Sequence, residues 1–327
     1  MSKRITLIGG GTGSFTLLTG LKLYPDLELG AIVAMSDDGG STGILRDEYG
    51  ILPPGDIRQC LVALSESESI WRDLFAYRFN EGSLEGQSFG NMFIGTLEKI
   101  TGDFEKALSL AGELLKIKGT VIPVTLDNVR LEGIGVNGNL VVGEKTIDTK
   151  KEKITNIRLV PEAYANPRAI KRILESDAII IAPGDLYTSI LPNLAVNGIC
   201  DAIRNTGAIK ILVVNLMCHK NHTDHLSVAG YVSLMEKYLG KETFDYVLYN
   251  NVLPTSEFMS YYSMGGELPV SWEEDTFLEW KKTMFIGHSL ISQRIPKRVE
   301  GDRIIRGLIR HDPMRTAALL YSLMVKK

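Results

Sequence analysis

The sequence predicts an α/β fold with one doubly wound, mostly parallel sheet and a small β-hairpin insertion. Apolar runs of strand length alternate with longer helical patterns towards both ends of the chain, which is the rhythm of βαβ units. Several of these runs are continuous rather than alternating, as in strands that are covered on both faces. Each run ends in a turn rich in glycine or polar residues. We expect one domain over residues 1–327.

The expected elements follow this alternation in chain order. The first part of the chain predicts a strand at about 3–8, a helix at about 12–23, a strand at about 28–35, helices from about 57 to 116 and a strand at 121–125. Residues 126–160 switch to short β patterns, and Asn137-Gly138 between apolar residues is a hairpin signal because both residues tolerate positive φ. The later part predicts strands at 178–182, 211–214 and 246–249 and a terminal amphipathic helix over 312–325.

Composition narrows the class of protein. The chain has 327 residues, a net charge of −3 and a pI near 6.0, whereas a nucleic-acid-binding surface needs a concentrated basic face. Cys60, Cys200 and Cys218 share no metal or redox spacing, which suits reduced thiols in a cytoplasm. No apolar stretch approaches the roughly 18 residues that span a bilayer. We expect a cytoplasmic protein that binds no nucleic acid and has no membrane span.

A glycine-rich turn follows the first predicted strand. It reads Gly9-Gly10-Gly11-Thr12-Gly13-Ser14, and its backbone amides could converge on an anion together with the amino terminus of the next helix. The alternative is a tight turn without a ligand. Ser14 stands where a dinucleotide fingerprint needs glycine, and the lysine of a P-loop is lacking. We predict a phosphate loop of another kind at Gly10, Gly11, Thr12, Gly13 and Ser14, with no permanent nicotinamide or flavin cofactor.

The loop after the second predicted strand, residues 36–59, is the most informative segment of the chain. It reads SDDGGSTGILRDEYGILPPGDIRQ. Asp37 and Asp38 could hold Mg²⁺, which takes one or two carboxylates together with substrate phosphates. They could instead bind ribose hydroxyls, as an acidic residue does in dinucleotide folds. A third interpretation is an Asp-Gly turn in which Asp38 bonds its own backbone.

Further side chains of this segment suit a phosphate ligand. Arg46 offers a bidentate fork for phosphate or carboxylate, although it could pair with Asp47 or Glu48 on the surface instead. Asp56 is suited to cap the helix that follows, and capping alone would explain it. The nucleotide-binding residues that we predict here and in the following helices are Ser41, Thr42, Gly43, Arg46, Asp56, Arg58 and Asn91.

A third loop, residues 183–189, again joins an apolar strand to a helix. Its hydroxyl groups and the helix amino terminus suit an anion. The ligand contacts predicted here are Gly184, Tyr187, Thr188 and Ser189. Farther along, His219, His222 and His225 with Asp224 suggest zinc, but their spacing and the lack of a fourth ligand weigh against that interpretation.

Seven segments spread over nearly the whole chain match one family. They are GGGTG at 9–13, SDDGGSTGILRDEYGILPPGDIRQCLVAL at 36–64, GN at 90–91, PGDLYTSILPNLAVNGI at 183–199, VNLM at 214–217, NN at 250–251 and IRHDP at 309–313. With these segments the chain resembles the CofD-like proteins, that is, the 2-phospho-L-lactate transferase-like family. It is most similar to their bacterial branch, the gluconeogenesis factors.

The resemblance implies a Rossmann-like core with a nucleotide across the three glycine loops. In the transferase branch, a phospholactyl group passes from a guanosine diphosphate carrier to a deazaflavin with magnesium, and Asp37 and Asp38 would hold the metal or orient the acceptor. In the bacterial branch, a UDP-sugar is bound and the outcome is regulatory, affecting cell shape and wall synthesis on gluconeogenic carbon. Tyr262 and Arg310 match positions that hold the UDP-sugar there, and Asn215 lies in the VNLM match.

Two departures from the family pattern fall near the expected sugar or acceptor side. Residues 218–223 read CHKNHT where the bacterial branch has a Thr-Gln-Pro-Gly-Glu-Thr run, and Asp185 replaces a commoner small residue. The first hypothesis is a regulatory protein that binds a nucleotide sugar, acts on a protein partner in wall synthesis and forms a homodimer. The alternative is an Mg²⁺-dependent transferase of a phospholactyl-type group from a nucleoside diphosphate ester.

Overall fold

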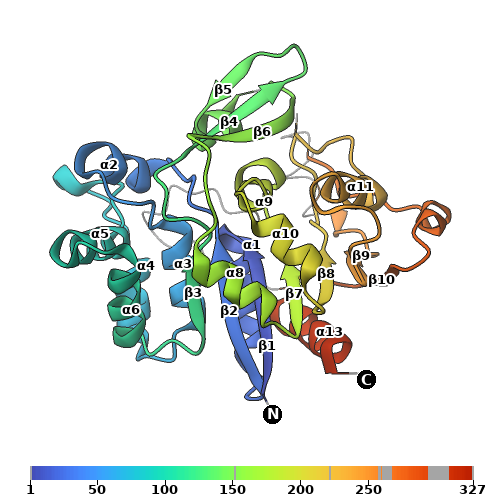
Figure 1. The fold of residues 1–327 in the computed structure, drawn as a ribbon, viewed down its shortest axis with the longest axis horizontal. Helices are drawn as coiled ribbons and strands as arrows, with labels where there is room; N and C mark the ends of the chain where they lie inside the picture. The colour runs from blue at the N-terminus through green and yellow to red at the C-terminus, as the bar shows by residue number, and fades with distance from the viewer. Residues whose placement is uncertain are drawn as a thin grey trace.

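The computed structural model describes residues 2–150, 152–220, 222–256, 259, 267–293 and 309–325. Its centre is a seven-stranded sheet in the order β10-β9-β8-β7-β1-β2-β3 (Figure 1). The strands are β1 (Lys3–Gly9), β2 (Leu27–Val33), β3 (Thr120–Pro123), β7 (Ala178–Ile181), β8 (Ile209–Val213), β9 (Tyr246–Asn250) and β10 (Met284–His288). All six pairings between them are parallel, which confirms the predicted α/β class.

The strand order explains where a ligand site can form. From the central β1 the chain runs outwards to β2 and β3, then crosses back to β7 and continues outwards to β10. The order therefore reverses between β1 and β7, and open parallel sheets bind ligands in the crevice beyond the strand ends at such a point.

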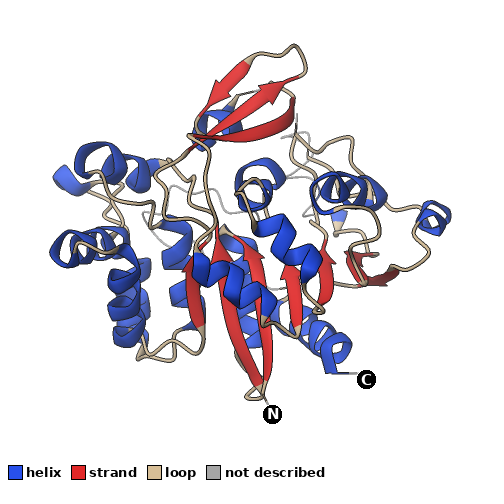
Figure 2. Cartoon of the chain, in the orientation of Figure 1, coloured by secondary structure: helices blue, strands red, loops and turns tan. Residues whose placement is uncertain are grey.

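Helices cover both faces of this sheet (Figure 2). The helix α1 packs against α3 and α13 on one face, while α8 packs against α10 in front of the strands in Figure 1. The helices are α1 (Gly11–Leu21), α2 (Gly40–Tyr49), α3 (Gly55–Leu64), α4 (Ser69–Ala76), α5 (Phe89–Thr101), α6 (Phe104–Leu114), α8 (Pro167–Leu174), α9 (Leu191–Leu194), α10 (Ile199–Asn205), α11 (Val228–Leu239) and α13 (Pro313–Val325). Short turns of helix also lie at Gly82–Leu84, Leu186–Ile190 and Glu274–Glu279. No helix among the described residues is both long and apolar enough to cross a membrane.

The predicted insertion forms a second, antiparallel sheet in the order β5-β4-β6. The hairpin of β4 (Arg130–Gly135) and β5 (Leu140–Val142) turns at Asn137-Gly138, where Gly138 has φ +78°, and β6 (Ile154–Val160) adds a third strand. A short helix, α7 (Glu144–Thr149), connects β5 to β6. Figure 1 shows this sheet above the carboxyl ends of the main strands, so the insertion stands over the predicted site.

Sequence analysis did not anticipate β10. Its residues are only partly buried, and Met284 at its start is exposed. The strand lies at the sheet edge, where one neighbour suffices, so it lacks the continuous apolar run that identified β7, β8 and β9.

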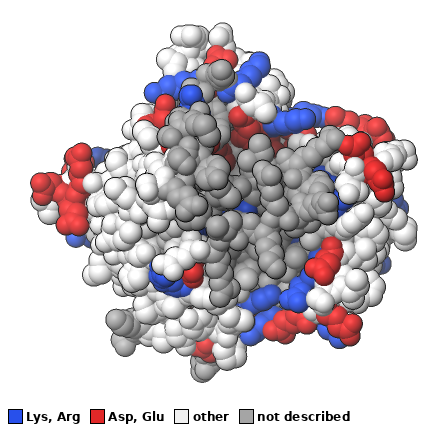
Figure 3. Space-filling model, turned by 180° about the vertical axis from the view of Figure 1, so that it is seen from behind, with Lys and Arg blue, Asp and Glu red and all other residues white. Residues whose placement is uncertain are grey.

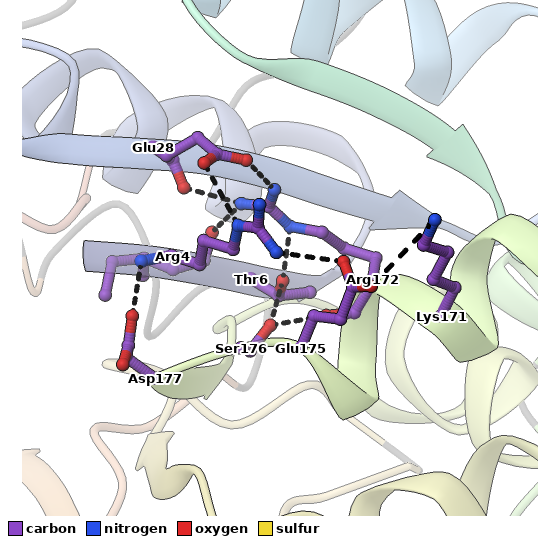
Figure 4. A network of polar contacts seen from close by, with 9 residues as sticks. Arg4, Thr6, Glu28, Lys171, Arg172, Glu175, Ser176 and Asp177 are labelled. Carbon is purple, nitrogen blue, oxygen red and sulfur yellow. Dashed lines mark hydrogen bonds and ion pairs between the residues drawn. The ribbon is translucent and has the colours of Figure 1, made fainter. Parts of the chain in front are cut away.

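A buried arginine, Arg172 of α8, joins this helix to β1 and β2 near the amino ends of the two strands (Figure 4). Its side chain is 8% exposed, and Nε donates to Oγ1 of Thr6 on β1 at 3.0 Å. The guanidinium also donates to backbone carbonyls of β1 and β2 and pairs with the carboxylate of Glu28. A Cβ on Gly30 would lie 2.6 Å from Nε of Arg172, so the glycine leaves room for this side chain.

We predict that Arg172→Met lowers the free energy of unfolding by about 3 kcal/mol, because a buried carbonyl, the Thr6 hydroxyl and Glu28 each lose a hydrogen bond from the guanidinium. Arg4→Met is the matched control, since Arg4 pairs with the same Glu28 but is 43% exposed and should contribute at most about 1 kcal/mol. Urea denaturation measures both variants. Equal losses of stability in the two variants would contradict the prediction that Arg172 stabilises the fold more than Arg4 does.

Candidate functional site

Three loops meet at the carboxyl ends of β1, β7 and β8. A Cβ on Gly13 would lie 1.6 Å from the carbonyl oxygen of Pro183, so only glycine permits this approach. The side chain of Asn215 accepts a hydrogen bond from the Gly184 amide at 2.9 Å and donates to the Gly184 carbonyl at 2.7 Å. The loops are therefore held together by backbone contact and by one amide side chain.

A cavity of about 190 Å³ opens where these loops meet. Five residues that the sequence singled out line it, namely Thr12, Gly13, Gly184, Asn215 and Arg310. The other lining residues are Thr16, Pro183, Leu216, Met217, Ile309 and His311. Burial lowers the pKa of His311 to about 4, so its imidazole is neutral at physiological pH. The cavity thus joins one cationic side chain to glycine backbone and neutral polar groups.

A carboxyl group, that of Asp56, faces the glycine loop of β1. A Cβ on Gly10 would lie 2.2 Å from Oδ2 of Asp56, and the backbone amide of Gly11 donates to this carboxyl. Burial, followed by the charge of Asp37, raises the pKa of Asp56 to about 7. The capping role predicted for Asp56 is wrong, because Pro54 takes the cap position and Asp56 lies inside the first turn of α3.

Asp37 and Asp38 diverge into different roles. Oδ1 of Asp37 accepts the backbone amide of Gly39 at 2.8 Å, so the local turn expected for Asp38 belongs to Asp37 instead. Asp38 accepts the amide of Lys145 at 3.0 Å and thereby holds the amino terminus of α7. This separation does not favour one ion bound by both carboxylates.

Asp37 has a different acidic partner, Glu144 of α7. Burial, followed by the charge of Asp37, raises the pKa of Glu144 well above its ordinary value. The charge of Asp56 acts in the same direction, so Asp37, Asp56 and Glu144 form one group of carboxyls, which we call the acidic cluster. A divalent cation or shared protons would relieve its repulsion.

The two predicted arginines of the long loop support its shape. Arg46 is buried and donates to the carbonyls of Asp37 and Val129 and to the side chain of Asn128, so it joins the loop to the insertion. The expected surface pair of Arg46 with Asp47 or Glu48 does not form, and Asp47 pairs with Arg130.

Arg58 stands at the centre of a second buried network. It donates to Oδ1 of Asn91 at 2.8 Å, and the amide of Asn91 donates to the hydroxyl of Thr42 at 3.3 Å. Ser41 accepts the amide of Ser88, also below the surface. These predicted residues therefore position the loop from beneath.

The third loop binds its own carboxylate at the helix start. Oδ1 of Asp185 accepts the amides of Tyr187 and Thr188, each at 3.1 Å. The anion site expected at this helix start is therefore occupied by the protein itself. Tyr187 and Thr188 are buried, as is Ser14 in the first loop, whereas Ser189 is partly exposed.

The histidines assemble differently from the expected group. His225 is exposed and lies 3.4 Å from Asp224, apart from the other two. His219 and His222 approach each other, and Asp185 joins them from the β7 loop. Burial lowers the pKa of His222. Tyr262 lies outside the described residues.

Sequence analysis missed the acidic residues of the insertion. Glu144 and Asp148 sit on a six-residue helix with no motif of its own, and their partners lie far away in sequence. Asp148 lies beside Asp185 and the hydroxyl of Thr188. Desolvation of the carboxyl by the surrounding protein, followed by the charge of Asp185, raises the pKa of Asp148 to about 7, although the residue as a whole is exposed.

Asp56 should make stability depend on pH. Its pKa is about 7 in the folded chain against an ordinary 3.8, so the folded state keeps a proton that the unfolded chain loses. This contribution is complete below about pH 4 and is lost as pH rises through 7. Asp56→Asn should exceed the wild type in free energy of unfolding at pH 8, by about 4 kcal/mol, and the gap should close towards pH 4.

Denaturant titrations between pH 4 and pH 8 measure this difference. Asp73→Asn, at an exposed position of α4, is the control for the same replacement elsewhere in the chain. A gap for Asp56→Asn that is constant over the range would refute the assignment.

Comparison with known proteins places this geometry in a family. A model described as 2-phospho-L-lactate transferase CofD matches residues 5–290. The gluconeogenesis factor of Bacillus subtilis is 37% identical over 326 residues, which are 98% of this chain and 98% of that protein. A relative from Nostoc sp. is 39% identical over 320 residues, covering 97% of this chain and 68% of its own length.

A solved structure shares the whole fold. The crystal structure of a member of the UPF0052 family from Bacillus halodurans superposes with a TM-score of 0.90 at 32% sequence identity, covering 98% of this chain and 99% of that one. The family match spans the sheet, the glycine loops and the insertion. This chain therefore belongs to the CofD family, and the relatives it resembles over nearly its full length are gluconeogenesis factors.

Proposed function

We propose that this protein binds a nucleoside diphosphate sugar of the UDP-sugar type across the tips of β1, β7 and β8. The supporting observation is the cavity at the switch point, where five predicted residues from four separate places in the sequence line one space. Glycine backbone lets a diphosphate approach closely, and the guanidinium of Arg310 matches its charge. The sugar would extend towards the insertion.

The acidic cluster gives this site a requirement for a cation. A diphosphate placed beside Asp37, Asp56 and Glu144 would be repelled by their negative charge. Oxygen donors of this kind fit Mg²⁺, which takes carboxylates together with phosphate oxygens. We propose that Mg²⁺ binds with the nucleotide and that these carboxyls hold it.

The biological role that we propose is regulatory. Its support is the similarity to gluconeogenesis factors over nearly the entire chain. The bound nucleotide sugar would report on precursor supply and, through a protein partner, adjust wall synthesis and cell shape on gluconeogenic carbon. A cytoplasmic homodimer is the form in which we expect it to act.

Binding should require Mg²⁺ at pH 8, and without Mg²⁺ it should strengthen as the pH falls. Isothermal titration with UDP-N-acetylglucosamine at pH 8 should show saturable binding that weakens at least tenfold without Mg²⁺. Without Mg²⁺, affinity should recover from pH 8 to pH 6, because Asp56, with a pKa of about 7, takes up a proton and its repulsion is lost.

Variants locate the site in the same experiment. Arg310→Met should weaken binding roughly tenfold, a loss of about 1.4 kcal/mol. Arg204→Met, an exposed arginine on α10, should bind as the wild type does. Equal binding by Arg310→Met and the wild type, or binding indifferent to Mg²⁺, would exclude the proposed arrangement.

A second candidate is transfer from a nucleoside diphosphate ester. The acidic cluster favours it, because a carboxylate in it could accept a proton from an acceptor hydroxyl. The acceptor oxygen would then attack the distal phosphorus, the phosphoanhydride bond would break, and a nucleoside monophosphate would leave. Positioning and charge neutralisation would supply the catalysis, without a protein nucleophile.

Product analysis separates the two candidates. With Mg²⁺ and a labelled nucleoside diphosphate ester, a transferase releases nucleoside monophosphate when an acceptor alcohol is present. Asp37→Asn should reduce that release at least a hundredfold. If the wild type and the variant both bind the ester without releasing nucleoside monophosphate, the transferase is excluded and the regulatory function is the remaining proposal.

A further inference from the structure

We propose that Asp185, His219 and His222 form a binding site for a divalent transition-metal ion, distinct from the Mg²⁺ position at the acidic cluster. The three side chains come from two loops, Asp185 from the end of β7 and the histidines from the segment after β8.

The distances suit ligands of one ion. Nδ1 of His219 lies 2.9 Å from Nδ1 of His222 and 3.7 Å from Oδ2 of Asp185, and one donor atom of each residue lies within 4.8 Å of the others. Ligand atoms about 2.0–2.1 Å from a shared ion lie about 3–3.5 Å apart. Only small adjustments of the side chains would bring the donors to equal distances around one centre.

The backbone holds these donors in place before any ion arrives. Oδ1 of Asp185 accepts the amides of Tyr187 and Thr188, which leaves Oδ2 to face His219. The amide of His219 donates to the hydroxyl of Thr223 at 2.7 Å, and the ring of His222 is fully buried. A site with fixed ligands loses little conformational freedom on binding.

The donor set selects the class of metal. Two imidazoles with one carboxylate suit Zn²⁺, Fe²⁺, Co²⁺ or Ni²⁺, whereas Mg²⁺ prefers oxygen ligands throughout. Three protein ligands leave coordination positions open for water or substrate. Asp148, adjacent to Asp185, adds negative charge that favours a cation at this place.

The site adjoins the nucleotide cavity through the β7 loop, because Asp185 follows directly on Gly184, which lines that cavity. If a nucleotide sugar binds there as proposed, the open positions of the ion would face the sugar or acceptor side. The metal inference itself requires no nucleotide, since it rests on the three side chains alone.

Zinc titration of the chelator-treated full chain tests the inference. We expect one equivalent of Zn²⁺ per chain, retained through dialysis, and intense visible absorption when Co²⁺ replaces it. Asp185→Asn keeps an oxygen that can accept the Tyr187 and Thr188 amides, and His219→Gln alters a half-exposed side chain, so both variants should fold. Each should lose at least tenfold in Zn²⁺ affinity.

His225→Gln is the matched control, because His225 is a neighbouring exposed histidine outside the group. It should bind Zn²⁺ as the wild type does. Absence of stoichiometric binding in the wild type would overturn the inference and assign the His219–His222 contact to a hydrogen bond. Equal losses in His225→Gln and His219→Gln would overturn it as well.

Nucleotide binding with Mg²⁺, measured on the same samples, separates the two proposals. Zinc binding without UDP-sugar binding would support the metal site and reject the proposed function. UDP-sugar binding without zinc binding would do the reverse.

Discussion

The close approach of Gly13 to Pro183 is the constraint on which the rest of the site depends. It brings the loops of β1 and β7 into backbone contact at the place where the strand order reverses. The paired hydrogen bonds of Asn215 with Gly184 join the loop of β8 to that contact. The parallel sheet forms the crevice, and the absence of a Cβ on Gly13 lets the loops of β1 and β7 approach each other closely.

The carboxyl groups of the site would repel the anionic ligand that we propose for it. Carboxyl groups lie beside backbone amides that would suit a phosphate, and burial, followed by the charge of Asp37, raises the pKa values of Asp56 and Glu144. Figure 3 shows Lys, Arg, Asp and Glu interspersed along the margins of one face of the molecule. The carboxyls with raised pKa values at the strand tips form a local concentration of acidic groups, whose repulsion cations or protons would relieve.

Sequence reasoning predicted the sheet and the loops well, because strand periodicity and glycine turns are local signals. It placed β7, β8 and β9 correctly and missed β10, whose partial burial leaves no continuous apolar run. It also singled out five residues that line the cavity, three from the glycine loops and Asn215 and Arg310 through the family resemblance. It missed the local contact in which Asp185 binds its own helix start. It could not foresee that Arg46 joins the insertion or that Glu144 reaches Asp37, because both depend on tertiary contact between distant segments.

The short helix of the insertion has one more consequence. Asp38 holds the amino terminus of α7, and α7 carries both Glu144 and Asp148. The position of the small sheet above the strand tips and the number of acidic groups near the crevice are therefore coupled through α7. If the small sheet and α7 moved away from the strand tips, both carboxyls would move with them. The site would then repel anions less as it became more open.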